Sequence, residues 1–524
     1  MHLKHPFASC LAFILAMFML ICAPSMAQDQ PTGTQGVFNV KSYGATGDGQ
    51  TLDSPAINKA IAACAAAGGG TVYLPAGTYL CGSIHMKSNI NLYIDAGAEI
   101  LGAPQEMHAY DPTEPFEGHA YQDGGHTYFQ NSLIWGENLK NVSITGHGEI
   151  NGGGMISGDR ANPKTPEGVK PYGIGNKSIV FKLCTNVLIR DVTIYHGGHF
   201  AILTTGCNML TIDNVTIDTN RDGMDLDCCQ NTTVSNCRVN SPWDDGICPK
   251  STYALGHLVP TENMTITNCQ VSGFEEGTLL NGQMIPGKKG NGRIKLGTES
   301  NGGFRNITIS NCTFRDCYGL ALEEVDGGTM ENITIDNITM YNTPSYAIYV
   351  TLGDRNRGPN VTANGIARNI FISNVISTDV GPLAGIEITG LPGDDIQNLR
   401  LDNIRMISKG GGTVEQANHE LKELDKGYPE PSQVGTTPSY GVFARHVQNL
   451  ELANVTVGFD KTDMRSPMIC DDVDTLQINN FQAQTAQGVV PAKFNNVQNL
   501  TVINSPVLNN VTPQEAPQGN VILH

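Results

Sequence analysis

Residues 306–314 have the sequence NITISNCTF, and residues 332–340 have the sequence NITIDNITM. In both, apolar residues stand at every second position after an asparagine, and a second asparagine comes five residues after the first. This alternation is the period of a β-strand with one buried face. The phrase recurs in degenerate form along the chain. Its copies begin at Asn141, Asn186, Asn208, Asn231, Asn263, Asn306, Asn332, Asn369, Asn398, Asn449, Thr475 and Asn499.

The copies of this phrase begin 22 to 51 residues apart. A fixed phrase at variable spacing indicates that each repeat is one stacked unit and that the extra residues are inserted loops. Asparagine fits the strand boundaries because its side chain tolerates tight turns and hydrogen-bonds along a stack. Leucine-rich repeats lack this grammar, and helical repeats do not fit the β-branched content. The sequence therefore predicts an all-β fold, a single-stranded parallel β-helix.

The composition agrees with a turn-rich β protein. The 524 residues include 59 glycines and 27 prolines, and only 16% of them are charged. One segment, residues 56–67, has a strong helical pattern and ends at Gly68. An amphipathic helix that precedes the repeats can cover the open end of a stack. We therefore expect residues 28–524 to form a single β-helix domain with this helix as its N-terminal cap.

The N-terminus resembles an export signal. Basic or titratable residues at positions 2 and 4 precede an apolar run over residues 11–22, and small residues follow up to Ala27. The apolar run is too short for a membrane span. Ile21 does not fit the position before a lipidated Cys22. We predict a signal peptide over residues 1–27 and a secreted or periplasmic protein that does not insert into a membrane.

The formal charge of the chain is −18. Repulsion over this whole surface would slow the approach of nucleic acid or of an acidic polysaccharide. We therefore expect no nucleic acid partner. An acidic polysaccharide that binds must meet a local basic patch.

Twelve of the 14 cysteines lie after the predicted signal peptide. Three of them, Cys237, Cys269 and Cys312, recur at one place in the repeated phrase. A free cysteine is small and apolar and suits an internal stack, which we favour over a disulfide-rich exported protein. The adjacent pair Cys228 and Cys229 has no explanation in the pattern. Cysteine spacing typical of structural zinc is absent from the sequence.

Two regions carry a family resemblance. Residues 39–49 (NVKSYGATGDG) and 69–79 (GGTVYLPAGTY) resemble the opening of polygalacturonase-like enzymes, family 28 of the glycoside hydrolases. Residues 220–225 (NRDGMD) are similar to that family's Asn-Thr-Asp-Gly-x-Asp, and residues 243–251 (WDDGICPKS) to its Asp-Asp-Cys-Ile-Ala-x-Lys-Ser. The likeness continues at residues 297–303, 428–431 and 438–441. It implies a right-handed β-helix of the pectin-lyase-like type.

These two motifs contain three aspartates on neighbouring coils, Asp222, Asp244 and Asp245. Strands of successive coils lie about 5 Å apart, so the three carboxylates converge. Single displacement at a glycosidic bond requires one acid for the leaving oxygen and one carboxylate that activates water. The resemblance implies that Asp244 is the general acid, that Asp222 and Asp245 hold the water, and that the anomeric centre is inverted. A turn or a calcium site is the alternative interpretation of such aspartates.

Two departures bear on the substrate. Gly290-Asn291-Gly292 stands where the family has Gly-His-Gly, and Asn291 cannot carry a charge. The family's Arg-Ile-Lys, which grips the galacturonate carboxylate, would fall at residues 321–323. There Glu323 would repel that carboxylate. We therefore expect rhamnogalacturonan or a decorated pectin rather than plain polygalacturonate.

The remaining candidate substrate-binding residues surround the same coils. Alternation buries Ile294 and directs Arg293 and Lys295 outward together, so that they hold a carboxylate or, alternatively, stand as solvated surface charges. The full predicted set comprises Asn220, Trp243, Lys250, Asn291, Arg293, Lys295, Glu299 and Glu323. The loops over residues 104–134 and 152–175 are long enough to wall off one end of a groove.

We predict a monomeric, metal-independent hydrolase without a cofactor that acts on an α-linked, uronic-acid-containing polysaccharide such as pectin, rhamnogalacturonan or galacturonan side chains. Two alternatives stay open. One is a calcium-dependent polysaccharide lyase in which Lys250 or Arg293 abstracts a proton. The other is a β-helix that binds glycans without cleaving them.

Overall fold

The computed structural model describes residues 36–115, 124–153, 155, 176–424, 426–509 and 521–523. These residues belong to one compact unit that begins at Gly36. The predicted signal peptide, residues 1–27, and most of the loop over residues 152–175 lie outside the described residues. None of the described helices is long and apolar enough to cross a membrane.

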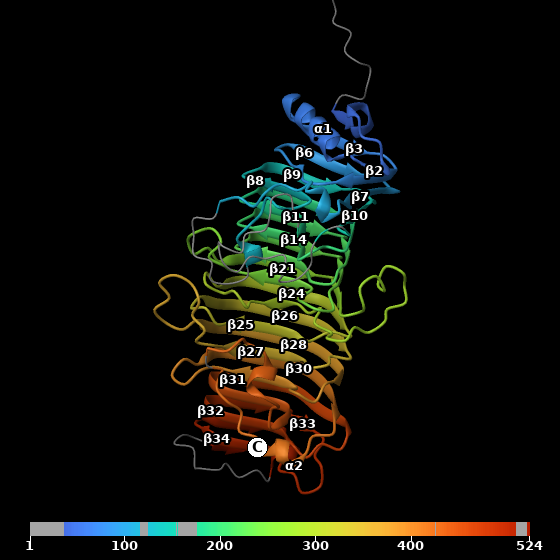
Figure 1. Ribbon diagram of the computed structural model, residues 1–524. Coiled ribbons are helices and arrows are strands. Elements are labelled where there is room, and N and C mark those ends of the chain that lie inside the picture. Colours follow the sequence, from blue (N-terminus) through green and yellow to red (C-terminus); the bar gives the residue numbers. More distant parts are fainter. Residues whose placement is uncertain are drawn as a thin grey trace, which may run out of the picture. The chain divides into compact units, whose positions relative to one another are not determined.

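The chain winds into stacked coils (Figure 1). Within the described part of the chain, the strands named below pair with one another in parallel, as the repeats predicted. The first face of the stack begins with β5 (Ile84–His85), β8 (Ile134–Glu137), β11 (Lys177–Lys182), β14 (Phe200–Thr205), β17 (Asp222–Asp227) and β20 (Ile247–Lys250). It continues through β23 (Lys295–Leu296), β25 (Leu320–Glu324), β27 (Ile348–Leu352), β29 (Ile386–Thr389), the first parts of β31 (Ser439–Lys461) and β32 (Ser466–Asn479), and β34 (Ala492–Val497).

The second face contains β1 (Val37–Asn39), β3 (Gly70–Leu74), β6 (Ile90–Ile94), β9 (Lys140–Thr145), β12 (Thr185–Arg190), β15 (Asn208–Asp213), β18 (Gln230–Ser235), β21 (Thr261–Thr267), the first parts of β24 (Phe304–Arg315), β26 (Thr329–Tyr341), β28 (Ile366–Val380) and β30 (Ile396–Gly410), the middle part of β31, the second part of β32, and β35 (Leu500–Ile503) and β36 (Val521–Leu523). The third face contains β2 (Asp48–Leu52), β4 (Gly77–Cys81), β7 (Ala98–Gly102), β10 (Glu149–Asn151), β13 (Thr193–Tyr195), β16 (Thr216–Asp218), β19 (Arg238–Asn240), β22 (Gln270–Ser272), the second parts of β24, β26, β28 and β30, the last part of β31, and β33 (Gln482–Ala483).

In most copies of the phrase the first asparagine sits at a corner between two faces, in the left-handed backbone region. The φ angles of Asn306 and Asn332 are 54° and 58°, and asparagine tolerates this region better than most residues. The side chains also form a ladder: Asn332 Nδ2 donates to Asn306 Oδ1 at 3.0 Å, and Asn369 Nδ2 donates to Asn332 Oδ1 at 3.1 Å. The predicted role of asparagine along the stack is confirmed.

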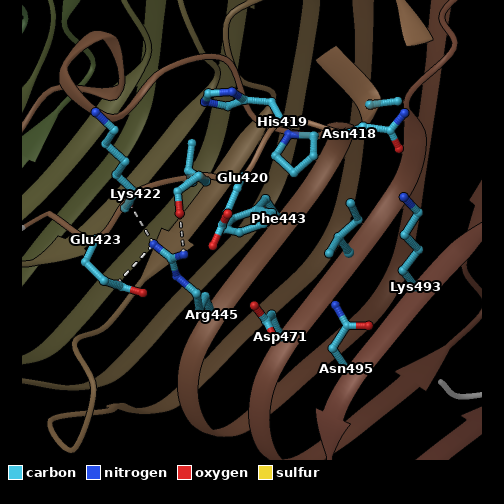
Figure 2. A pocket seen from close by; sticks show the side chains of 14 residues that line it. Asn418, His419, Glu420, Lys422, Glu423, Phe443, Arg445, Asp471, Lys493 and Asn495 are labelled. Atoms are coloured by element: carbon cyan, nitrogen blue, oxygen red, sulfur yellow. Dashed lines mark hydrogen bonds and ion pairs between the residues drawn. The ribbon is translucent and has the colours of Figure 1, made fainter. Parts of the chain in front are cut away.

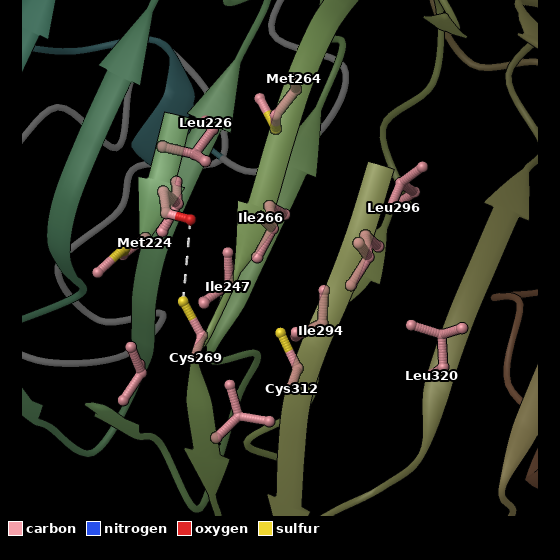
Figure 3. Close-up of a cluster of buried hydrophobic side chains, with 14 of the residues drawn as sticks. Met224, Leu226, Ile247, Met264, Ile266, Cys269, Ile294, Leu296, Cys312 and Leu320 are labelled. Atoms are coloured by element: carbon pink, nitrogen blue, oxygen red, sulfur yellow. Dashed lines mark hydrogen bonds between the residues drawn. The ribbon is translucent and has the colours of Figure 1, made fainter. Parts of the chain in front are cut away.

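The alternating apolar residues fill the interior of the stack. Met224, Ile247 and Ile294 occupy equivalent positions on successive coils and are completely buried (Figure 3). Strands on all three faces contribute to one continuous apolar cluster that extends from Val40 to Leu508. Because each coil contacts only its neighbours, the core grows by addition of coils.

The cysteines after residue 36 are all free and buried, which confirms the prediction of internal stacks. Cys237, Cys269 and Cys312 lie on successive coils. The adjacent residues Cys228 and Cys229, which the pattern left unexplained, have different surroundings. Cys229 joins the core, whereas the Cys228 thiol faces Asp227 Oδ1 at 3.3 Å.

The helix α1 (Ser54–Ala66) covers the first coils, close to the predicted range of 56–67 (Figure 1). Its buried side chains Ile57, Ile61 and Cys64 lie on one face and contact β1, β3 and β5. The other helices are short: η1 (Val40–Tyr43), η2 (Gln105–Met107), η3 (Gly124–His126), α2 (Val414–Ala417), α3 (Pro431–Val434) and η6 (Pro506–Leu508). The strand-free segment 411–438 between β30 and β31 carries α2 and α3, and we call it the 411–438 segment.

The asparagine ladder generates a stability prediction. Asn332→Ala loses two ladder hydrogen bonds. It also places in the left-handed region an alanine, whose side chain cannot form the local hydrogen bonds that help asparagine to adopt it. We expect it to lower the free energy of unfolding by about 1–3 kcal/mol. Asn332→Gly loses the same hydrogen bonds but adopts positive φ freely, so it is expected to be less destabilised. Urea unfolding of both variants checks this, and equal losses would show that the backbone conformation plays no part.

Candidate active site

Three aspartates converge where β17 begins and where the chain enters β20. Oxygen atoms of Asp222, Asp244 and Asp245 all lie within 4.8 Å of one another. The parallel pairing of β17 with β20 sets this spacing, and Gly223 N–H donates to the Asp245 carbonyl at 2.9 Å. Asp222 and Asp245 are buried, whereas the Asp244 side chain is 24% exposed. The predicted convergence is present, and the catalytic roles remain predictions.

The Asp245 carboxylate is held by two buried cations. Arg293 Nε donates to Asp245 Oδ1 at 2.8 Å, and Lys295 Nζ forms an ion pair with Asp245 Oδ2. Burial alone would raise the pKa of Asp245, but the charges of Lys295, Arg293 and Lys250 outweigh it and hold the pKa well below its ordinary value. Asp245 therefore stays ionised at the floor of the site.

Asp222 has the opposite environment. Burial raises the pKa of Asp222 well above its ordinary value, and the carboxylates of Asp244 and Asp225 raise it further. No described cation lies closer to its carboxylate than the Arg221 guanidinium, at 3.7 Å. The cluster therefore separates a proton-holding carboxyl, Asp222, from an ionised one, Asp245, as the crowding of like charges predicted.

Arg221 is a member of the site that the sequence analysis missed. Its Nη2 lies 2.8 Å from Asp244 Oδ2, and its side chain is 21% exposed. The residue stands inside the quoted NRDGMD motif, where the family motif has threonine. That difference was visible in the sequence, but the sequence does not show which carboxylate the guanidinium meets.

A second buried network lies directly behind the aspartates. Lys250 Nζ lies 2.9 Å from Glu299 Oε2 and 3.9 Å from Asp225 Oδ2. Arg357 Nη2 lies 2.9 Å from the other oxygen of Glu299. The predicted sugar-binding residue Glu299 thus serves, in this structure, as the counter-charge of Lys250.

His126 joins this network from the loop over residues 104–134. Its Nε2 lies 3.1 Å from Asp225 Oδ2, and its Nδ1 lies 3.7 Å from Asp227 Oδ2. Burial lowers the pKa of His126, but the two aspartates outweigh it and raise the pKa to about 10. His126 is therefore a buried cation. The sequence analysis assigned no role to it, because a loop residue carries no periodic signal.

Arg293 and Lys295 point to the outer side of the coil, with Ile294 in the core, as alternation predicted. They are not solvated, so that alternative is wrong: each is 1% exposed. The 411–438 segment covers them. Arg293 donates to Glu430 and to the Tyr346 hydroxyl, and Lys295 Nζ donates to the Tyr428 hydroxyl at 3.5 Å.

Glu323 corrects one expectation. Its strand is one coil beyond Lys295, in the predicted register, because Lys295 pairs with Ala321. However, Glu323 is completely buried, and burial raises its pKa to about 8 against the opposing charges of Lys295 and Arg293. At neutral pH this carboxyl is mostly protonated. It therefore does not repel a substrate carboxylate as an anion would.

Asn220, Trp243 and Asn291 form the rim that carries Asp244. Trp243 N–H donates to the Asn220 carbonyl at 3.2 Å, and Asn291 Nδ2 donates to the Trp243 carbonyl at 3.2 Å. The Trp243 ring is 44% exposed, and Lys289 Nζ lies 5.0 Å from its centroid. An exposed indole beside the aspartates can stack on a sugar ring.

Among the described residues, two groups of side chains have ligand atoms close enough for a cation. One is the aspartate cluster itself, where Arg221 pairs with Asp244, and Arg293 and Lys295 pair with Asp245. The other consists of Asp395, His446 and Asp472 at a corner of the last coils. His446 Nδ1 lies 2.6 Å from Asp472 and its Nε2 lies 3.3 Å from Glu423, so both ring nitrogens have protein partners.

Comparison with known proteins bears on the family. Residues 37–275 match a family model described as rhamnogalacturonase A/epimerase, pectate lyase-like. A probable polygalacturonase of Vitis vinifera is 24% identical over 76% of this chain and 80% of the relative. The exo-poly-alpha-D-galacturonosidase of Dickeya chrysanthemi is 25% identical over 79% of this chain and 76% of the relative. The resemblance to the polygalacturonase-like proteins of family 28 is confirmed.

A solved structure shows the same fold in this polygalacturonase-like group. The Yersinia enterocolitica family 28 exopolygalacturonase superposes with a TM-score of 0.61 at 18% identity, over 85% of this chain and 79% of that one. The predicted fold class, a single-stranded right-handed parallel β-helix with an N-terminal capping helix, is confirmed.

The unequal surroundings of the aspartates predict opposite effects on stability. Asp222 has a raised pKa in the folded state, so it destabilises the fold at pH 7, and Asp222→Asn is expected to match or exceed the wild-type melting temperature. Asp245 has a lowered pKa, so it stabilises the fold above its ordinary pKa of 3.8. Asp245→Asn removes the carboxylate partner of the buried Lys295 and one of the carboxylates paired with the buried Arg293, and it is expected to lose about 3–5 kcal/mol.

Thermal and urea unfolding at pH 7 measure both variants. The difference between them should narrow as the pH falls below 3.8, where the unfolded-state Asp245 takes up its proton. Equal stabilities at pH 7 would contradict the assignment of the two environments.

Proposed function

We propose that this chain is an inverting glycoside hydrolase that cleaves α-linked galacturonan. The observation that carries the proposal is the convergence of Asp222, Asp244 and Asp245, with one carboxyl favouring a proton and another held ionised. The relatives named polygalacturonase and exo-poly-alpha-D-galacturonosidase support the substrate. Rhamnogalacturonan, which the sequence departures favoured, is the second substrate to test.

The family resemblance assigns the roles of the three aspartates. Asp244, at the mouth of the cluster, is placed to protonate the leaving glycosidic oxygen, and Asp245, at the floor, takes the proton from the attacking water. The water oxygen bonds to the anomeric carbon on the face opposite the leaving group. Asp222 fixes this water and relays to Asp244 the proton that Asp245 has taken from it, because oxygen atoms of all three carboxyl groups lie within 4.8 Å of one another. Each turnover thus consumes one water molecule and restores both carboxyl groups.

Arg221 offers the means to select an acidic sugar. Its partly exposed guanidinium pairs with Asp244 at 2.8 Å when no substrate is bound. A uronate carboxylate would compete for this guanidinium and draw it away, which leaves Asp244 free to carry a proton. A neutral sugar offers no such exchange. The exposed Trp243 provides a stacking surface beside it, and substrate contacts for Asn220, Lys250, Asn291, Arg293, Lys295, Glu299 and Glu323 remain predictions.

The 411–438 segment supports action at a chain end. Its Leu421, Leu424 and Val434 pack against Phe443 and Ile469 of the first face, and its Tyr428 and Glu430 reach the cations of the site. The first face is thereby covered on the C-terminal side of the aspartates. We propose that a polysaccharide enters from the other side and is cleaved near its end.

The calcium-dependent lyase is disfavoured by the state of its proposed bases. Burial lowers the pKa of Lys250, but Cys248, Glu299 and Asp225 outweigh it and hold the pKa well above its ordinary value. Arg293 is likewise buried and paired with carboxylates. A cation that keeps its proton cannot abstract another.

We further propose that the chain acts as an exported monomer, because a polymeric substrate does not enter cells; residues 1–27 would direct the export.

The central test is Asp244→Asn. We expect it to lower kcat by about 10³-fold on oligogalacturonides, since a general acid contributes roughly 10²–10⁴-fold, while the fold is retained. Product analysis by proton NMR should show inversion and no ultraviolet-absorbing unsaturated sugar. Retained configuration would contradict single displacement, and an unsaturated product would establish the lyase. Rhamnogalacturonan oligosaccharides in parallel decide the substrate.

The proposed role of Arg221 has its own test. Arg221→Gln keeps hydrogen-bonding capacity but removes the charge, so we expect kcat/KM on trigalacturonate to fall by about tenfold or more. The low activity on a neutral galactotrioside should change little. Arg190→Gln, which removes an exposed arginine from the second face, is the control. An equal loss on acidic and neutral substrates would show that Arg221 does not recognise the carboxylate.

A further inference from the structure

A separate cavity of about 700 Å³ lies on the last coils of the first face (Figure 2). Its floor comes from β31, β32 and β34, and its wall from the 411–438 segment. The residues that line it are Ala417, Asn418, His419, Glu420, Leu421, Lys422, Glu423, Pro438, Phe443, Arg445, Ile469, Asp471, Lys493 and Asn495. We propose that this cavity is a second binding site, for the carboxylate-bearing sugars of an acidic oligosaccharide, distinct from the cleavage site.

The cavity belongs to the same face of the stack as the aspartates. Outward positions run in register from Lys295 through Tyr349 and Phe443 to Lys493. β31 is five strand steps from β20 on this face, and neighbouring strands are about 4.8 Å apart, so the two sites are separated by roughly 24 Å. A glycan bound here does not occupy the cleavage site.

The 411–438 segment divides the face into these two compartments. Leu421 and Leu424 pack on Val325, Phe443 and Ile469, which anchors the segment between the sites. Residues 428 and 430 face the cleavage site, whereas residues 417–423 face the cavity. One insertion therefore closes the first compartment and builds the wall of the second.

The cavity presents polar groups that the protein leaves unused. The side chains of Asp471, Lys493 and Asn495 form no hydrogen bond or ion pair with the described residues. All three are only partly exposed and stand on adjacent strands. Figure 2 shows them on the floor of the cavity beside Arg445. Groups held in this way on strands are preorganised for a ligand.

Arg445 is fixed in position by the wall. Its Nη1 donates to the Leu421 carbonyl at 2.7 Å, its Nη2 donates to the Lys422 carbonyl at 2.9 Å, and Glu423 lies 3.1 Å away. Its buried Nε has no acceptor among the described residues. The guanidinium is therefore rigid and adds a fixed positive charge to the lining of the cavity.

The charge balance admits an anion. Among the lining residues three cations, Lys422, Arg445 and Lys493, face three carboxylates, Glu420, Glu423 and Asp471. The chain as a whole carries −18, so a locally neutral cavity with an unpaired lysine is a favourable place for an acidic sugar. The volume of the cavity accommodates a short oligosaccharide.

The experiment uses the full chain with Asp244→Asn, so that the probe is bound but not cleaved. Titration calorimetry with trigalacturonate should give two binding sites. Adding Lys493→Ala and Asn495→Ala should weaken one of them by about tenfold or more and leave the other unchanged. Lys461→Ala, an exposed lysine on the same strand β31 as Arg445, is the matched control and should retain both sites.

Three results would overturn the proposal. They are a single binding site in the Asp244→Asn protein, two sites whose affinities do not change on the double substitution, or an affinity for neutral galactotriose equal to that for trigalacturonate. The melting temperature of the double variant should equal that of the parent, since neither side chain forms a hydrogen bond or an ion pair with the described residues. In the chain that keeps Asp244, the double substitution should leave the rate of trigalacturonate hydrolysis at its wild-type value. If hydrolysis itself were absent, the second site would still be measurable by binding, so the two proposals fail separately.

Discussion

The structure depends on one backbone constraint: each coil must turn a corner through the left-handed region at the same point as the coil before it. Asparagine meets this constraint at Asn306, Asn332 and Asn369, and its amide hydrogen-bonds to the equivalent residue one coil away. Because the corners coincide, the strands stay in parallel register and the apolar residues stack. Every outward side chain is then placed at a spacing that the strand separation sets, including the aspartates of β17 and of the turn before β20.

The same register makes the site electrostatically unequal. Asp245 precedes a coil that brings two cations against it, whereas Asp222 begins a strand flanked by carboxylates. Two chemically identical side chains thus acquire different protonation states from their neighbours one coil above and below. The cluster thus contains one carboxyl group that favours its proton and one that stays ionised.

The sequence predicted the features that repeat. The period of the asparagine phrase located the strands, and the spacing of residues 222 and 244 placed their carboxylates together. Contacts made by inserted loops were not predictable, because they have no period. Tyr428 meets Lys295 across 133 residues, and His126 reaches Asp225 from a loop. Burial was also invisible to the pattern: Glu323 was expected to act as a charge, but its surroundings favour the protonated carboxyl.

The 411–438 segment enters and leaves the stack between β30 and β31, which pair directly with each other over most of their length. The coils on either side therefore do not need the insertion in order to stack. The length of the segment can therefore differ without a change in the pairing of β30 with β31. A lineage could lose the segment and gain an open groove, or lengthen it and narrow the entrance, while the aspartates stay in place. The part of the molecule that controls access of a polymer is thus structurally separate from the coils that hold the aspartates.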